Sequence, residues 1–540
     1  MRKVVFCGVL LGLIFFSFNV VLADVQVVSG NITENTTWSG EILLRGAVFV
    51  KAPATLTIEP GTIIYGEQAT IGTLIIERGA KIHAEGTLQA PIVFTSELTA
   101  IDPGSRARGD WGGLIINGYA PINVPGGEAI GEGDTGVYGG NDPHDNSGIL
   151  RYVRVEYAGH EFSPENELNG IAFQGVGDGT TVDHVQVHMN LDDGIEMFGG
   201  TVNFKYALTT NIGDDNFDWT DGWQGKAQFL VCQQRADDAD NGIEADNNAE
   251  NNNYTPRSNP TIYNITLIGD PDFSEGEESD LGMLLREGTA GRIYNAIVVG
   301  FKDPGLDIDH TATFEQADAR TLVMGNSIFW NNGSNQGGQN FSKATFDDDP
   351  AAPYAATWGL QEVDPKILNP YELVNPDFRP GSDSPAVDGT IPVATPPDDG
   401  FFESVNFIGG VDPNNDWTKG WTTFPLFSDI SSSHWAFEYV KNLRDLGWTT
   451  GYPDGTYGPE NSVSRAEMAA FLIRAKIGDD FTYEETPHFP DISSDHWAFK
   501  YIQKLYELGI TTGYPDGTYG PYNNVTRAEM AAFLIRAFVS

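Results

Sequence analysis

The sequence predicts a mainly β protein: a right-handed parallel β-helix (a solenoid) followed by a small α-helical domain of two repeats. From about residue 30 to residue 425, short stretches of alternating apolar and polar residues recur, with glycines roughly every 20 residues. In the last ~115 residues, one pattern is written twice at a constant offset, so that Trp435 recurs as Trp497. These observations predict a long solenoid and a doubled small unit.

Residues 1–23 are typical of a secretory signal. Arg2 and Lys3 supply positive charge, residues 4–18 an apolar core, and residues 21–23 a small-residue cleavage end. A membrane anchor is disfavoured because Ser17 and Asn19 interrupt the apolar run. We therefore expect an exported protein with no transmembrane segment in the mature chain.

The net charge and the cysteine content exclude some classes of function and of structure. The chain has 31 basic and 75 acidic residues, a net charge of −44, and removal of the signal would make it −46. Such a surface argues against nucleic acid and against unaided binding to anionic lipid. One cysteine, Cys232, would remain after cleavage, so no disulfide within the chain can form and stability must come from burial.

The solenoid is expected over residues 24–424. The motif around Thr55 recurs around Thr73, a step that we interpret as the passage from one rung to the next. Two more rungs are expected to begin at Ile262 and Ile293. Other strands are expected at residues 92–95, 113–116, 150–157, 181–187 and 201–208. A β-sandwich is the main alternative, but its turns should be closer and less regular.

Several motifs in this region resemble those of exported bacterial β-helix proteins. They are Gly-Asp-Trp-Gly-Gly at 109–113, Asp-Asp-Gly-Ile-Glu followed by Phe-Gly-Gly-Thr within 192–201, and the acidic segments 214–218 and 241–246. The match extends to residues 412–421, which we expect to close the solenoid. To our knowledge that family has no assigned chemistry, so the resemblance supports the fold and says little about activity.

Acidic pairs recur along the solenoid and suggest a metal site. Asp192-Asp193, Asp214-Asp215 with Asp218, and the group 237–240 follow one another at nearly constant steps. One rung per step would stack the carboxylates along one edge, where they repel unless protonated, paired or bridged by a cation. Oxygen ligands favour Ca²⁺, so the first five aspartates form a candidate calcium site. Solvated turn residues are the simpler alternative.

A polysaccharide lyase or hydrolase is the alternative function. Asp192, Asp193, Asp214 and Asp215 would be its acids, with His160, His184 or His188 nearby. The expected solenoid, residues 24–424, contains no Gly-His-Gly or Arg-x-Lys element of the kind that pectin hydrolases carry, and His184 and His188 are expected to face one side of a strand. We therefore expect no catalytic residues, and a solenoid that serves a structural, adhesive or binding purpose.

Each C-terminal repeat is predicted to contain two helices joined by a turn. Ser464 to Glu467 and Thr526 to Glu529 fit capping boxes, in which hydroxyl and carboxylate satisfy backbone N–H groups at the helix start. In the first copy, an earlier helix is expected over 435–446 and a tight turn over 452–456.

These residues resemble the S-layer homology domain, over 425–480 and again over 487–540. The resemblance implies non-covalent anchoring to a cell-wall polysaccharide, often one that carries pyruvate ketals. It also implies polymer-binding residues, which map to Arg465, Arg527, Trp435, Trp497, Asp454 and Asp516. The alternatives are an internal ion pair for the arginines and a core position for the tryptophans.

The number of repeats departs from the family pattern. Such anchors commonly have three repeats, whereas this sequence holds two. Either two repeats suffice, or chains associate to complete the bundle. The sequence thus predicts a secreted protein of the cell surface or cell wall that displays a β-helix.

Overall fold

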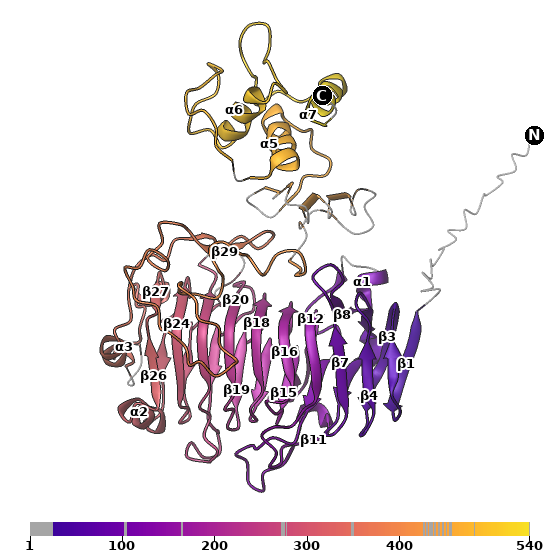
Figure 1. Cartoon of the computed structure of the whole chain (residues 1–540), viewed down its shortest axis with the longest axis vertical. Helices are drawn as coiled ribbons and strands as arrows, with labels where there is room; N and C mark the ends of the chain where they lie inside the picture. The colour runs from indigo at the N-terminus through magenta and orange to yellow at the C-terminus, as the bar shows by residue number, and fades with distance from the viewer. Residues whose placement is uncertain are drawn as a thin grey trace, which may run out of the picture.

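The computed structural model describes residues 25–538 except for 102–104, 164–165, 272–275, 277, 347–349, 425–426, 428–429, 431–435, 437–438, 441–442, 445–447, 450, 453–455 and 480. The predicted signal segment 1–23, Trp435 and Asp454 therefore lie outside the described residues. Figure 1 shows a long stack of strands with a small helical part beyond one flank.

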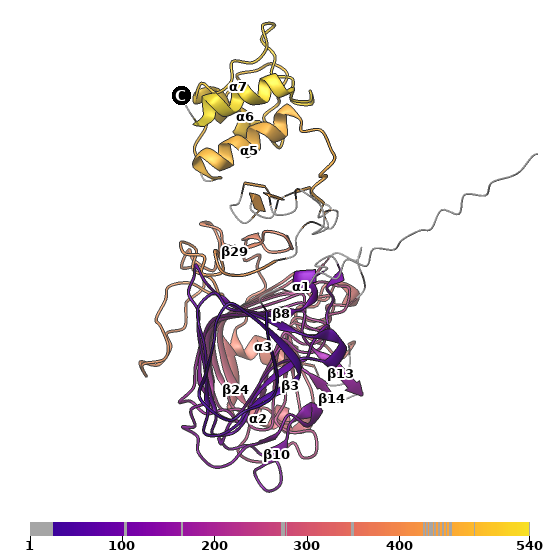
Figure 2. The same cartoon turned by 90° about the vertical axis from the view of Figure 1, so that its right-hand side faces the viewer.

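The predicted parallel β-helix is confirmed. A 23-stranded sheet of parallel pairings winds through three faces, and the view along its length shows the coils closing around a core (Figure 2). The first face holds β1 (Gln26–Ile32), β3 (Glu41–Val50), β5 (Ile63–Gly66), β8 (Ile92–Ser96), β12 (Gly148–Glu156), β16 (Thr181–His188), β18 (Asn203–Thr210), β20 (Lys226–Gln233), β22 (Thr261–Ile268), β24 (Gly291–Val299) and β27 (Ile328–Trp330).

The other two faces complete each coil. The second face holds the end of β3, then β6 (Thr73–Ile76), β9 (Gly113–Asn117), β15 (Ile171–Gln174), β17 (Ile195–Phe198), β19 (Phe217–Thr220), β21 (Ile243–Ala245), β23 (Leu284–Leu285) and β25 (Asp307–Ile308). The third holds β2 (Thr36–Trp38), β4 (Thr55–Ile58), β7 (Lys81–Glu85), the first halves of β12, β16, β18, β20, β22 and β24, and β26 (Leu322–Gly325). Val185, Ala207 and Leu230 stack inside, each no more than 1% exposed.

One coil is longer than the step predicted from the repeated motif. Thr55 pairs with Lys81 of the next coil and not with Thr73. Thr55 and Thr73 lie in strands β4 and β6 of the same coil, with β5 between them, so this prediction was wrong. The later step is confirmed, because Ile262 pairs with Ile293.

The long strands bend where the third face meets the first. The bend residue has a positive φ, which L-residues seldom adopt outside short polar side chains, yet in successive coils it is Tyr152, His184, Tyr206 and Phe229. Neighbouring rings in this series stack with centroids 4.4–4.9 Å apart. The stack contributes contacts that help to offset the backbone strain.

Shorter elements cover the ends and sides of the solenoid. Helices α2 (Thr311–Asp318) and α3 (Ala352–Trp358) pack their alanines onto one end of the core. The segment 412–421, expected to close the solenoid, instead lies along its side, where the Trp417 and Trp421 rings contact His184. The remaining elements are η1 (Gln68–Thr70), α1 (Leu98–Ile101), β10 (Ala129–Ile130), η3 (Glu132–Asp134), β11 (Val137–Tyr138), β13 (His160–Ser163), β14 (Asn166–Leu168), η4 (Ser334–Gln336), β28 (Ile367–Asn369) and β29 (Asp377–Pro380).

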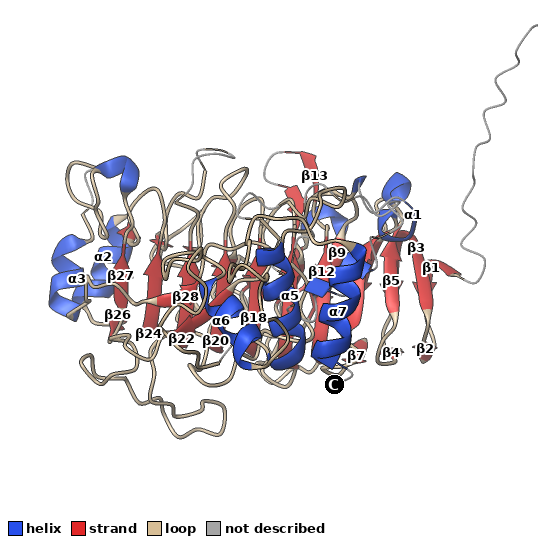
Figure 3. Cartoon of the chain, turned by 90° about the horizontal axis from the view of Figure 1, so that it is seen from above, coloured by secondary structure: helices blue, strands red, loops and turns tan. Residues whose placement is uncertain are grey.

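The helical part contains α5 (Arg465–Ile477), α6 (Phe499–Glu507) and α7 (Arg527–Phe538). From above, these helices overlie the middle of the solenoid (Figure 3). Both predicted capping boxes form, with Glu467 N–H donating to Ser464 Oγ and Glu529 N–H donating to Thr526 Oγ1, each over 3.2 Å. A search of the described residues for a helix long and apolar enough to cross a membrane found none.

Candidate functional sites in the repeats and the solenoid

Arg465 lies inside the contact between the two repeats. It begins α5 and is 3% exposed. Its Nε donates to the carbonyl of Tyr519 and its Nη1 to Glu529 Oε1, each over 2.8 Å. The guanidinium also lies over the rings of Tyr514 and Phe533. Arg465 thus forms the internal ion pair that was the alternative to polymer contact, and every one of these partners belongs to the second repeat.

Arg527, the equivalent residue of the second repeat, has the opposite environment. It begins α7 and is exposed. The apolar residues that follow it, Met530, Leu534 and Ile535, are 40%, 42% and 56% exposed, whereas their equivalents on α5 are buried. The exposed surface of α7 therefore combines a cation at the helix start with apolar side chains farther along the helix.

A groove of about 650 Å³ lies where the repeats meet. Its lining includes Tyr452, Tyr457, Glu467 and Phe471 from the first repeat and Trp497 from the second. Glu467 accepts hydrogen bonds from the Tyr452 hydroxyl over 2.7 Å and from Ser464. The lining is rich in aromatic rings and includes one carboxylate, Glu467, and one guanidinium, Arg474, which forms an ion pair with Asp479.

Exposed aromatic residues stand at the rim of this groove. Trp497 is 57% exposed and Tyr522 is 77% exposed. The His496 ring stacks on Trp497 and meets Tyr522 edge-on. Asp516, another predicted polymer contact, accepts hydrogen bonds from the backbone and hydroxyl of Thr518, which is an ordinary turn arrangement.

The predicted aspartates stack in the turns that lead into the second face. The carboxylate of Asp193 accepts the backbone N–H of Asp215 over 3.1 Å, and that of Asp215 accepts the N–H of Asn241 over 2.6 Å. The third level of the stack is therefore formed at Asp240 and Asn241. Asp237 and Asp238, expected at this level, instead form ion pairs with Arg108.

The stack brings together seven carboxylates in three linked groups. Each group offers oxygens that all lie within 4.8 Å of one another. One group is Asp192, Asp193 and Asp214, the second is Asp193, Glu196 and Asp218, and the third is Asp214, Asp215 and Asp240. Because Asp193 and Asp214 each belong to two groups, the seven side chains form one continuous carboxylate cluster.

Burial and mutual repulsion raise the pKa values throughout this carboxylate cluster. Burial is the larger cause, and neighbouring carboxylates add to it, raising the pKa of Asp192 to about 8 and that of Asp214 to about 6. The pKa values of Asp193, Glu196 and Asp215 are raised well above their ordinary values for the same two reasons. A cluster with such pKa values is electrostatically unfavourable when all its members are ionised.

Two buried oxygens at the carboxylate cluster lack a hydrogen-bond partner within the described structure. The amide of Asn169 donates to Glu196, while its own Oδ1 is buried without a hydrogen-bond partner in the described structure. Asp218 Oδ1 is enclosed in the same way. At the far side, Arg286 forms ion pairs with Glu244 and Asp246. Amide and carboxylate oxygens such as Asn169 Oδ1 and Asp218 Oδ1 are the ligands that a hard cation such as Ca²⁺ prefers.

Sequence reasoning did not assign Glu196, Glu244 or Asn169 to the site, and it placed Asp240 in the recurring acidic group without naming it as a metal ligand. The signal for the acids was present, because Asp-Asp-Gly-Ile-Glu, Asp-Asp-Asn-Phe-Asp and Asp-Asn-Gly-Ile-Glu begin at residues 192, 214 and 240. In the sheet, Glu196 pairs with Asp218 and Asp218 with Glu244. Asn169 carries no such signal, since it joins the carboxylate cluster from a separate loop.

Two of the histidines considered for catalysis, His184 and His188, have partners other than these aspartates. His184 takes part in the outer ring stack and contacts Asp183. His188 is 1% exposed and contacts Thr210. Neither histidine belongs to the solenoid core, which takes Val182, Val185 and Val187 from the same strand.

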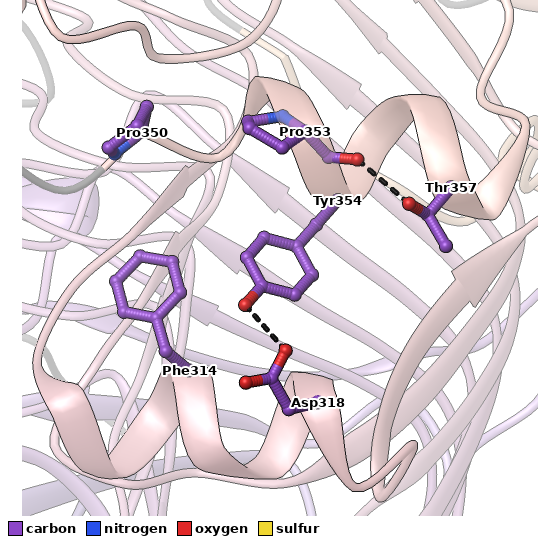
Figure 4. A pocket seen from close by; sticks show the side chains of 6 residues that line it. All are labelled: Phe314, Asp318, Pro350, Pro353, Tyr354 and Thr357. Carbon is purple, nitrogen blue, oxygen red and sulfur yellow. Dashed lines mark hydrogen bonds between the residues drawn. The ribbon is translucent and has the colours of Figure 1, made fainter.

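A shallow depression lies between α2 and α3 at the end of the solenoid (Figure 4). Its single carboxylate, Asp318, accepts a hydrogen bond from the Tyr354 hydroxyl over 2.8 Å, and Phe314, Pro350 and Pro353 supply apolar walls. This arrangement is explained by packing of the end cap.

Comparisons with known proteins agree with both halves of the fold. The family model for the pectate-lyase-like beta helix domain matches residues 30–357, and that for the S-layer homology domain matches 426–469 and 488–531. Cell surface glycoprotein 1 of Acetivibrio thermocellus is 38% identical over 120 residues, which are 21% of this chain and 5% of that protein. The cellulosome-anchoring protein of the same organism is 36% identical over 132 residues, 24% of this chain and 28% of that protein.

Two further relatives match a similar share of this chain. S-layer protein EA1 of Bacillus anthracis is 33% identical over 112 residues, 21% of this chain and 13% of that protein. An endoglucanase of a Bacillus species is 36% identical over 132 residues, 24% of this chain and 13% of that protein. The matched parts thus span less than a third of each of these four relatives. Because the beta helix model covers more than half of its residues, the chain belongs to the family of pectate-lyase-like beta helix domains, and it carries two S-layer homology repeats.

Proposed function

We propose that this chain is a secreted surface protein whose S-layer homology repeats hold it non-covalently on a cell-wall polysaccharide and display the β-helix outward. The match of two such repeats supports the proposal, as do the similarities to a cellulosome-anchoring protein and an S-layer protein. The large negative charge suits a protein that stays soluble until the repeats attach it.

The polymer contact is proposed at the aromatic rim of the groove. Trp497 and Tyr522 present large, solvent-exposed faces, and His496 stacks against Trp497. Exposed aromatic clusters beside a concave surface are typical of binding sites, since a ligand that covers them releases ordered water. The exposed Trp497 is the observation that carries the proposal. That the polymer bears pyruvate ketals, and that Arg527 and Asp516 contact it, remain predictions.

A sedimentation assay on purified cell walls tests this contact. The full chain should pellet with the walls, and Trp497→Ala combined with Tyr522→Ala should stay largely in the supernatant. Trp330→Ala removes an exposed tryptophan from the solenoid and is the matched control, expected to pellet like the unmodified chain. Equal pelleting of all three proteins would refute the proposed contact.

For the solenoid, we propose that the carboxylate cluster binds Ca²⁺. Seven carboxylates that are largely removed from water, with the Asn169 Oδ1 unpartnered beside them, call for cations to offset their repulsion. Polysaccharide cleavage is the competing proposal, favoured by the endoglucanase relative. It fits less well, because Asp193 and Asp215 are only 6% and 4% exposed and a sugar ring would have to reach them.

Removal and return of Ca²⁺ test this proposal. Calcium added to chelator-treated protein should raise the thermal unfolding temperature, because the ion binds the folded state. Asp193→Asn with Asp218→Asn should abolish that rise and, since it removes repulsion, should unfold at a higher temperature than the unmodified chain in chelator. Asp383→Asn, a change on the exposed surface, should respond to calcium normally. Release of sugar from a wall polysaccharide, or no calcium response, would contradict the proposal.

We also propose that copies of the chain associate through their repeats. The support is the open surface on α7, where apolar residues that are buried in the first repeat are exposed in the second.

A further inference from the structure

The second repeat binds the side chain of Arg465 where the two repeats are in contact. Arg465 enters a receptacle formed by the rings of Tyr514, Tyr519 and Phe533, the carbonyl of Tyr519 and the carboxylate of Glu529. The Tyr514 hydroxyl donates to the same carboxylate oxygen over 3.2 Å. Aromatic faces and a carboxylate together match the planar guanidinium.

The first repeat contains the same receptacle. The equivalent residues there are Tyr452, Tyr457, Phe471 and Glu467, and all four line the groove between the repeats. The Tyr452 hydroxyl donates to Glu467 over 2.7 Å, as its counterpart does in the second repeat. In the second repeat, Arg465 fills the receptacle. In the first repeat, the receptacle is part of the groove of about 650 Å³.

The matching guanidinium is exposed on the same chain. Arg527 begins α7 as Arg465 begins α5. Around it, Met530, Leu534 and Ile535 are exposed, while their counterparts Met468, Leu472 and Ile473 are 8%, 3% and 0% exposed against the second repeat. The exposed surface of α7 therefore carries a cation and apolar side chains whose counterparts on α5 are buried between the repeats.

A pair of equivalent tyrosines shows the same difference: one is buried between the repeats and the other is exposed. Tyr501 packs against Arg474 of α5, with the guanidinium 5.1 Å from the ring centre, and is 3% exposed. Its counterpart Tyr439 is 67% exposed. In a contact between copies that repeats the internal one, Tyr439 would meet Arg536, the counterpart of Arg474 on α7.

We infer that Arg527 of one copy seats in the Glu467 groove of a second copy, so that chains join head to tail through the contact that joins the repeats within a chain. The inference rests on the proposed function, since it gives the anchoring repeats their partner. Arg527 would meet the opposite charge of Glu467, while Arg474 in the same groove is already paired with Asp479. Trp497 and Tyr522 line the same groove. A contact of this kind uses different surfaces on the two partners, so it closes into a ring or continues as a chain.

Sedimentation velocity of the full chain, without wall polymer, tests the inference. The unmodified protein should associate as its concentration rises. Arg527→Ala and Glu467→Gln should each weaken association by about tenfold or more, and glutamine keeps the helix cap intact. Glu250→Gln, an exposed change on the solenoid, should associate normally. A monomeric unmodified chain, or unchanged association of the first two variants, would overturn the inference.

Mixing the two variants tests the direction of the contact. Arg527→Ala keeps an intact groove and Glu467→Gln keeps an intact arginine, so an equimolar mixture should form pairs with one intact contact and nothing larger. Wall pelleting measured in parallel separates this inference from the proposed function. If Arg527→Ala stays associated but leaves the walls, Arg527 contacts polymer and the inference is wrong. If Trp497→Ala with Tyr522→Ala still pellets while Arg527→Ala dissociates, the polymer contact is wrong and the inference holds.

Discussion

At the scale of single residues, a role could be predicted from the sequence when the partner residues are close in sequence. It could not be predicted when the partner lies far away in the sequence. Ser464 and Glu467 are close neighbours in sequence, so their capping box was readable. The partner of Arg465 is Glu529, in the other repeat, and no local pattern reveals that pair. The same reason hid Asn169, which meets Glu196 from another coil.

The two equivalent arginines give a prediction at this scale. Arg465→Ala should lower the unfolding free energy of the repeats by on the order of 3 kcal/mol, because it removes a buried cation that several groups contact. Arg527→Ala, in the same motif but exposed, should stay within about 0.5 kcal/mol. Urea unfolding of dilute protein, followed by the helical circular dichroism signal, measures both. Equal losses would contradict the assigned environments.

At the scale of elements, the parallel strands were predictable and their arrangement into coils was only partly so. The motif that links Thr55 to Thr73 repeats within one coil, while Thr55 pairs with Lys81 of the next coil. Bends at Tyr152 and His184 also break the alternation of side chains within one strand, because a left-handed residue reverses the side on which the next one points. Helix starts were predicted better, since a cap involves neighbours in sequence.

The caps predict how the helices respond to acid. Burial alone would raise the pKa of Glu467, but hydrogen bonds from Ser464 and Tyr452 outweigh it and lower that pKa. Hydrogen bonds from the backbone and hydroxyl of Thr526 lower the pKa of Glu529. A lowered pKa means that these carboxylates stabilise the folded repeats above about pH 4.5, and that this stability is lost as the pH falls through the lower, folded-state value.

Urea midpoints of the helical signal between pH 7 and pH 3 measure this effect. The midpoint should decline below about pH 4.5, and Glu467→Gln with Glu529→Gln should flatten the decline, because glutamine keeps the cap without titrating. A variant that declines as steeply as the unmodified chain would show that other acids govern the response.

At the scale of the whole molecule, the chain combines a long rigid solenoid with a small helical module. The acidic repeats in the sequence predicted a stack of aspartates, and in the structure seven carboxylates gather there, including Glu196. The doubled segment predicted the helical module, whereas the open receptacle and the exposed Arg527 emerge only once the two repeats are compared in space. These features describe a displayed solenoid, an anchor and a means of joining copies.

The measurement that tests anchoring most directly is pelleting with purified cell walls of the full chain beside a chain that stops at residue 424. We predict that the full chain pellets, that the shortened chain remains in solution, and that soluble wall polysaccharide releases the full chain. If the shortened chain pellets as well as the full one, the solenoid holds the protein on the wall and the central claim about the repeats is wrong.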